Sequence, residues 1–187
     1  MSQPIAADTD LPVTLADVEA ARPLLAGAVL RTPTLRAPRL ADLTGADVWV
    51  KYENFQVTAS FKERGALVKL SRLAPEEARR GVVAMSAGNH AQAVAYHGER
   101  LSISTTIVMP QTTPQVKVMA TRAFGANVVL FGETVADAYE EAERIVHEEG
   151  RVFVHPYDDR EVIAGQGFVD LEMIEDGPAF DAVVVPI

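Results

Sequence analysis

The stretch "GVVAMSAGNHAQAVAYHGERLSISTTIVM", residues 81–109, decides the fold class. It begins with the short apolar run GVVAMS, continues through NHAQAVAYHGER, which reads as a helix, and ends in the β-branched run ISTTIVM. A strand, a helix and a second strand in this order predict two parallel strands joined by a crossover helix. Residues 81–109 therefore favour an α/β fold.

The same alternation continues on both sides of this unit. Further strands are predicted at four runs: ADVWVKY (46–52), ANVVLF (126–131), RVFVH (151–155) and DAVVVPI (181–187). Helices are predicted between them, beginning at Thr14, from Ser60 to about residue 73, and over 113–125, 134–150 and 159–176. Strands alternating with helices predict parallel sheets with helices on both faces.

Some helix starts have local signals. Thr14 stands at the capping-box spacing from Asp17, and Ser60 and Thr134 are placed as N-caps. RTPTLRAP, residues 31–38, is expected to be extended, because each proline disfavours helix at the residue before it.

The composition restricts the class of function. Acidic residues outnumber basic ones, 26 to 17, and the net charge of −9 argues against nucleic acid or an anionic membrane as a partner. The absence of cysteine excludes disulfides, zinc–thiolate sites and cysteine nucleophiles. Residues 1–12, expected to form a loose tail, lack the apolar run of a signal peptide. A cytoplasmic location is therefore expected.

The first motif that carries chemistry is SAGNH, made of Ser86, Ala87, Gly88, Asn89 and His90. It follows a predicted strand and opens a predicted helix. Small residues let a ligand approach the backbone, and the free N–H groups of a helix start attract anions. Asn89 can cap the helix or offer its amide to a ligand. The alternative is a capped tight turn with nothing bound.

The second motif is TASFKERGA, residues 58–66, which places Lys62 in the first turn of a helix. That end of a helix is positive, so a lysine there loses favourable interactions of its charged form. Partial burial would lower its pKa further and suit it to Schiff-base chemistry with a carbonyl. The alternative is a lysine that points to solvent and pairs with Glu63 or Glu53.

Other candidate residues have structural interpretations. The four histidines do not have a metal-ligand spacing, so no metal site is expected. His97 and His147 are expected on helix surfaces. Lys51 and Arg64 are expected to form structural ion pairs near the site.

Taken together, SFKERGA and SAGNHAQ resemble the motifs of the fold type II pyridoxal-phosphate enzymes, and among them the threonine dehydratases. RTPTL, WVKYENFQ, VMPQTTPQVKVMATRAFGANVVLFG and VIAGQGFVDLEM extend the resemblance over nearly the whole chain after the first dozen residues. The resemblance implies a complete small domain over residues 54–155, with 1–53 and 156–187 belonging to a larger domain and the site in the cleft between them.

The resemblance also implies roles for individual residues. Lys62 matches the lysine that forms the Schiff base with pyridoxal 5'-phosphate and shuttles the α-proton, and Phe61 matches a residue beside the cofactor ring. Asn89 matches the asparagine that hydrogen-bonds the cofactor's 3-hydroxyl. Residues 86–90 match the loop that binds the substrate carboxylate. Ala59 departs from the family, which has glycine there, and Phe168 stands where threonine is common.

The implied reaction is dehydration and deamination of L-threonine, and of L-serine, to a 2-oxo acid and ammonia. Related serine racemases have serine, a second acid–base group, where this chain has Ala87, which favours the dehydratase. Serine racemase and hydroxyaspartate dehydratase remain alternatives from the same family. A non-catalytic binding or interaction fragment is an alternative from another class.

The length raises a separate expectation. The family continues after VVVPI with a glycine-rich loop for the cofactor phosphate, so the 187 residues are expected to be part of a longer polypeptide. The expected partners are a small amino-acid substrate and further copies of the chain in a homo-oligomer, with neither nucleic acid nor membrane.

Overall fold

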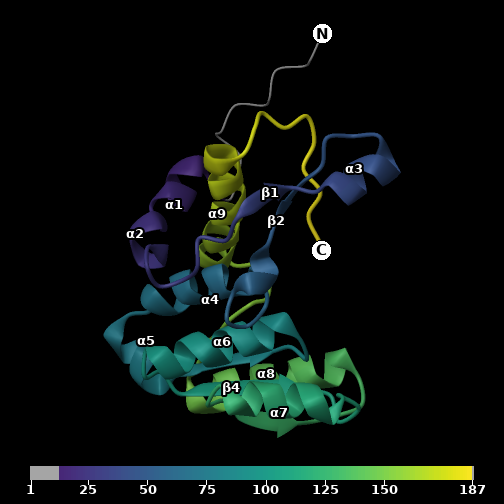
Figure 1. Ribbon diagram of the computed structural model, residues 1–187. Helices are drawn as coiled ribbons and strands as arrows, with labels where there is room; N and C mark the ends of the chain where they lie inside the picture. The colour runs from purple at the N-terminus through teal and green to yellow at the C-terminus, as the bar shows by residue number, and fades with distance from the viewer. Residues whose placement is uncertain (1–12, 187) are drawn as a thin grey trace.

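The computed structural model describes residues 13–186. The tail expected at residues 1–12 lies outside the described residues. Figure 1 shows α9 (Arg160–Asp176) beside α1 (Leu15–Glu19) and α2 (Arg22–Leu25) at one end of the molecule, with a helix-covered sheet at the other. Among the helices of residues 13–186, none has the length and apolar character needed to cross a membrane.

The main sheet confirms the α/β prediction. Its four strands are β3 (Val82–Met85), β4 (Thr105–Met109), β5 (Asn127–Leu130) and β6 (Val152–Phe153). They lie in the order β5-β4-β3-β6, and every pair is parallel. The chain runs from β3 outward to β5 and then returns to the other side of β3. The order therefore reverses between β3 and β6, which is where open α/β sheets bind ligands, at the carboxyl ends of the strands.

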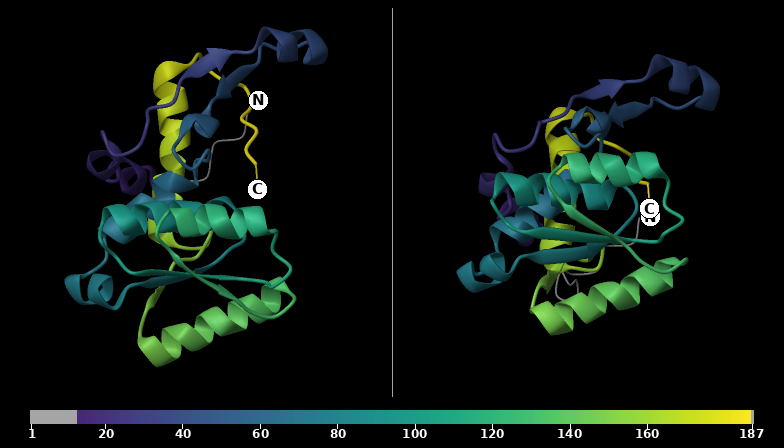
Figure 2. Two further views of the ribbon diagram at one scale, coloured as in Figure 1. Left: turned by 60° about the horizontal axis from the view of Figure 1, so that its bottom comes forward. Right: turned by 90° about the horizontal axis from the view of Figure 1, so that it is seen from below.

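Helices cover both faces of this sheet, as Figure 2 shows. On one face, α6 (Asn89–Arg100) and α7 (Gln115–Ala123) pack with Val82 and Ala84 of β3. On the other face, α8 (Val135–Glu149) packs with the alternate strand residues Val83 and Val108. The period of two along buried strands places apolar side chains in both layers.

A close helix–helix contact joins the sheet region to the rest of the chain. α4 (Lys62–Ser71) packs on α9, and each helix has a glycine at the contact. A Cβ atom on Gly165 would lie 2.6 Å from the backbone oxygen of Arg64, and one on Gly65 would lie 2.6 Å from Gln166 Nε2. The glycines of KERGA and AGQG thus allow the two backbones to touch, which fixes the start of α4.

The remaining elements lie mainly toward the N-terminus. β1 (Thr34–Arg36) pairs antiparallel with β2 (Trp49–Lys51), within the segments predicted to be extended and β. A 3₁₀ turn at Glu53–Phe55 follows, and α3 (Pro38–Thr44) and α5 (Pro75–Arg80) are further short helices. Sequence reasoning missed α2, α3 and α5, which all have proline in the first turn, where it is compatible with a helix.

The predicted helix starts are mostly correct. Thr14 and Thr134 each form a capping box with the aspartate three residues on. Ser60 is not the N-cap of α4: that position is Phe61, and Ser60 Oγ instead accepts a hydrogen bond from Lys62 N at 3.2 Å.

The strand predicted at DAVVVPI is wrong. Residues 181–186 form no strand, because none of the strands in the described part of the chain offers them a partner, and a strand needs one for its backbone hydrogen bonds. All four strands of the main sheet fall within the predicted small domain, 54–155. The domain boundaries themselves stay a prediction.

Candidate active site

The site lies where β3 and β6 end side by side. Ser86 follows β3 and Val154 follows β6, and parallel strands end at the same edge of a sheet. His90 Nε2 donates a hydrogen bond to Val154 O at 2.9 Å, and Lys62 Nζ donates one to Pro156 O at 2.8 Å. The segment after β6 therefore brings Lys62 and the 86–90 loop, the two predicted motifs, to one place.

Lys62 is half-buried at the first position of α4. Burial lowers the pKa of its amine below the usual value for lysine. The alternative in which Lys62 points to solvent and pairs with Glu63 or Glu53 is wrong, because Glu63 accepts from Thr58 N and Glu53 pairs with Arg64. The amine is thus presented with a carbonyl as its hydrogen-bond partner.

The turn before Lys62 is tightly held. Ala59 has φ of 54°, in the left-handed region that alanine disfavours. The carboxylate of Glu63 accepts a hydrogen bond from Thr58 N on the near side of this residue, and Ser60 Oγ accepts from Lys62 N on the far side. Phe61 lies beside the amine, with Lys62 Nζ 5.2 Å from its ring centroid.

The 86–90 loop is open by comparison. Ser86 Oγ accepts from Gly88 N at 3.2 Å, and Gly88 is the N-cap of α6 without a side-chain cap bond. Asn89 is exposed at the first helical position, so of its two alternatives the one in which it caps the helix is wrong. Within residues 13–186, the backbone N–H groups of Asn89, His90 and Ala91 donate no hydrogen bond. A Cβ atom on Gly88 would meet no heavy atom within 4 Å. The loop can therefore receive an anion.

His90 faces the protein interior, and Ala87 lies at the edge of the core. His90 is buried, and burial lowers the pKa of its imidazole to about 4. A neutral ring that donates from Nε2 to a carbonyl leaves Nδ1 as an acceptor, and Nδ1 has no partner among the described residues. Ala87 is half-buried against the core. A direct role of His90 in substrate binding stays a prediction.

A buried ion network stands behind the site. Arg64 is fully buried and pairs with Glu53 at 2.8 Å and Glu172 at 2.9 Å. Lys51 pairs with Glu172 at 2.5 Å. This confirms the structural ion pairs predicted for Lys51 and Arg64. Since Arg64 is the second residue after Lys62, the network anchors the helix that presents the amine.

Two cavities lie elsewhere. One of about 310 Å³ is lined by Asp170 and apolar side chains of α9 and by apolar side chains of residues 180–185, and another of about 290 Å³ lies between α2 and α9. Neither is lined by Lys62 or by the 86–90 loop. We therefore locate the site by the chemistry of its residues and the sheet topology.

The sequence pattern described as "Pyridoxal-phosphate dependent enzyme" matches residues 25–187. The chain belongs to this family. The L-threonine ammonia-lyase of Thermotoga maritima is 47% identical over 175 residues, which are 94% of this chain and 44% of that protein. The chain spans about half the length of the curated relatives it matches.

Comparison with solved structures supports the same family assignment. The serine racemase of Dictyostelium discoideum superimposes with a TM-score of 0.85 at 33% identity, over 91% of this chain and 56% of that one. The processed threonine deaminase isoform 2 of Solanum lycopersicum has a TM-score of 0.80 at 40% identity, over 86% and 46%. The fold is that of the fold type II enzymes, as the sequence predicted.

The residues present fit the family's cofactor. Lys62 supplies a primary amine of lowered pKa, which reacts with an aldehyde. The Phe61 ring beside it gives an aromatic cofactor an apolar contact, and the free N–H groups at the start of α6 suit an anionic group.

Sequence reasoning missed the segment that joins the two motifs. The carbonyl oxygens of Val154 and Pro156 hold His90 and Lys62, across 64 and 94 residues of sequence. The predicted strand at 151–155 was a usable signal, because ligands in open α/β sheets bind beyond the carboxyl ends of strands.

Proposed function

We propose that the protein containing these residues eliminates the β-hydroxyl group of L-threonine, and of L-serine, as water, and that one water then hydrolyses the resulting imine to a 2-oxo acid and ammonia. One observation carries the proposal: the half-buried Lys62 amine and the unpaired N–H groups of α6 meet at the edge where β3 and β6 end. The names of relatives at 42–47% identity, threonine ammonia-lyase and threonine dehydratase, support it.

In this proposal each motif handles one part of the substrate. The substrate carboxylate accepts hydrogen bonds from the backbone N–H groups at the start of α6, which orient the α-carbon toward Lys62. Lys62 Nζ takes the α-proton, and its lowered pKa raises the fraction of neutral amine at neutral pH. Bound pyridoxal phosphate withdraws electrons from the α-carbon and so makes that proton acidic.

Ala87 favours elimination over racemisation. Racemisation requires proton donors and acceptors on both faces of the α-carbon, and an alanine side chain cannot transfer a proton. The likeness to a serine racemase, at a TM-score of 0.85, favours racemisation as the second candidate. Hydroxyaspartate dehydration is a third, because it requires the same elimination from a more acidic substrate.

We also propose a cytoplasmic homo-oligomer with a small amino-acid substrate. The absence of cysteine and the net charge of −9 fit a protein of a reducing compartment that does not bind nucleic acid. Size measurement of the purified protein by light scattering tests the assembly.

The test uses the native polypeptide that carries these residues, supplied with pyridoxal phosphate. We expect formation of 2-oxo acid from L-threonine and L-serine, at a rate at least about tenfold above D-serine formation, a ratio that corresponds to ~1.4 kcal/mol in barrier height. Turnover of hydroxyaspartate alone, or equal rates of elimination and racemisation, would contradict the proposal. A Lys117→Ala variant, changed at an exposed lysine of α7, serves as the matched control.

A further inference from the structure

Two titratable side chains next to the site have no part in the proposed reaction. Glu63 is 1% exposed and His97 is 0% exposed, where α4 packs on α6. The expectation that His97 lies on a helix surface is wrong, because the face of α6 that bears it is covered by α4. His147, on α8, is exposed as predicted.

The polar atoms of these side chains form a row from α6 to α4, with a gap of 4.0 Å between His97 and Glu63. Arg100 Nη1 lies 3.3 Å from His97 Nδ1, and a guanidinium can only donate, so Nδ1 accepts and Nε2 carries the proton. His97 Nε2 lies 4.0 Å from Glu63 Oε2 and has no hydrogen-bond partner in the described part of the chain. The other oxygen of Glu63 accepts from Thr58 N.

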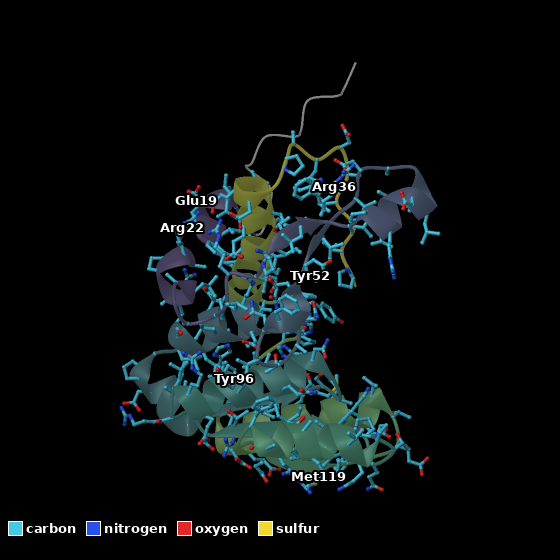
Figure 3. All side chains as sticks on the ribbon, viewed as in Figure 1. Glu19, Arg22, Arg36, Tyr52, Tyr96 and Met119 are labelled. Atoms are coloured by element: carbon cyan, nitrogen blue, oxygen red, sulfur yellow. The ribbon has the colours of Figure 1, made fainter. Side chains whose placement is uncertain are left out.

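The residues around Glu63 and His97 shield both side chains from water. Tyr96, labelled on α6 in Figure 3, packs against the His97 ring with 4.9 Å between centroids. Burial lowers the pKa of His97 to about 3 and raises the pKa of Glu63 above its usual value. The charged groups that act on the pair are Arg100 of α6 and Glu53 of the 3₁₀ turn. His97 is therefore a neutral donor that faces a carboxyl group.

We propose that Glu63 and His97 are positioning residues, which tie α6 to the turn that presents Lys62. Glu63 accepts a hydrogen bond from Thr58 N, which comes just before the left-handed Ala59. Glu63 also directly follows Lys62 in the helix. His97 lies on the same helix as the open N–H groups of Asn89 and His90. A shift of about 1 Å would bring Nε2–H into hydrogen-bonding range of Glu63. That hydrogen bond would hold the two motifs of the site in register from behind.

The inference rests on the role of Lys62 in the proposed function, so its test measures Lys62 directly rather than turnover. The native polypeptide is treated with pyridoxal phosphate and borohydride, and the coupling of each lysine is measured by peptide mass spectrometry. Lys117 is exposed and serves as the internal reference. The variants are His97→Leu, which removes the donor, and His97→Gln, whose amide NH₂ takes the place of Nε2–H. His147→Leu is the matched surface control.

We expect His97→Leu to lower the Lys62-to-Lys117 coupling ratio at least about tenfold, and His97→Gln to keep it within about twofold of wild type. Glu63→Leu should match His97→Leu, and His147→Leu should match wild type. A packing role alone predicts that His97→Gln fails like His97→Leu, with coupling of all lysines rising together as the fold loosens. That result, or an unchanged ratio in His97→Leu, would overturn the proposal.

Failure of the proposed function gives a different pattern. If the native polypeptide does not turn over threonine but couples selectively at Lys62, the function is wrong and the positioning test still holds. If wild type shows no preference for Lys62 over Lys117, both proposals are overturned.

Discussion

The two junctions that form the candidate site are built in opposite ways. The turn before Lys62 is held by hydrogen bonds that Thr58 N donates to Glu63 and Lys62 N donates to Ser60, and it retains a left-handed alanine. The 86–90 loop has one internal hydrogen bond, an exposed Asn89 and helix N–H groups without partners in residues 13–186. The first junction uses backbone N–H groups to fix its own turn, and the second leaves the N–H groups of its helix start available.

The difference follows from what each junction has to do. An amine that reacts with a carbonyl must be held in position, because misplacement by about 1 Å can slow a reaction about a hundredfold. An anion-binding loop must instead keep donors free until the ligand arrives, since a donor that is already bonded gains little. Single substitutions can disturb one junction at a time, whereas acid disturbs both.

The largest expected effect is that of Lys62→Ala. Reductive coupling of pyridoxal phosphate at this position is lost, and turnover falls at least about a hundredfold, or ~2.7 kcal/mol. The fold survives, because the amine is half-buried and loses one hydrogen bond, worth about 1 kcal/mol. Peptide mass spectrometry and thermal unfolding measure both effects. A variant that keeps coupling and turnover would remove Lys62 from the site.

Gly165→Ala disturbs the support of the held junction. The new Cβ would lie 2.6 Å from both Arg64 O and Gly65 Cα, which are backbone atoms and cannot yield. Overpacking costs up to about 3 kcal/mol and alanine gains about 1 kcal/mol of helix propensity, so we expect a net loss of about 2 kcal/mol in unfolding free energy. Urea unfolding measures it. Gly88→Ala, in open space at the other junction, should change stability by less than about 0.5 kcal/mol.

Acid should act on both junctions through His90 and His97. Their pKa values, about 4 and about 3, lie below the value of 6.5 for an unperturbed histidine, so the unfolded chain binds more protons than the folded one. Stability is therefore full above about pH 6.5 and falls as pH drops toward 4, by up to ~1.4 kcal/mol per pH unit for each histidine.

The measurement for this prediction is urea unfolding between about pH 7 and about pH 5. His97→Gln should remove one histidine's share of the pH slope, and His147→Gln, at an exposed site, should leave the slope unchanged. Equal slopes in wild type and His97→Gln would show that folding does not lower the pKa of His97.

The smallest expected effect is that of Ala59→Gly. Relief of the left-handed backbone gains about 1–2 kcal/mol, and the greater freedom of glycine in the unfolded chain offsets up to about 1 kcal/mol, so we expect a gain of about 0.5 kcal/mol. Ser102→Gly, with φ of 56°, should gain a similar amount. The two differ in one respect: Ala59→Gly should also change the coupling ratio of Lys62, and Ser102→Gly should not.

The sequence predicted the features that depend on interactions between residues close together in the chain. The capping box predicted at Thr14 and the N-cap predicted at Thr134 involve neighbours three residues apart, and both are confirmed. Apolar, β-branched runs predicted the four strands of the main sheet, and all four are confirmed. The positions of Lys62 and residues 86–90 at one site came from the family resemblance.

The errors involve contacts between distant residues. Helix periodicity does not reveal that α4 covers the face of α6 bearing His97, so the histidine was expected on the surface. The apolar run at 181–187 has strand composition, but a strand also needs a partner. The carbonyl that receives the Lys62 hydrogen bond is 94 residues away, and a backbone group has no sequence signature.

The ion network behind the site limits the mutational paths open to this protein. Lys51, Glu53, Arg64 and Glu172 carry two positive and two negative charges, joined by contacts of 2.5–2.9 Å. Loss of any one of them leaves a buried charge without compensation, at a cost of about 3–5 kcal/mol, whereas replacement of a whole network by apolar residues is often neutral. Each single substitution in this network therefore produces a destabilised protein. An apolar core at this place can evolve only if all four residues are replaced together.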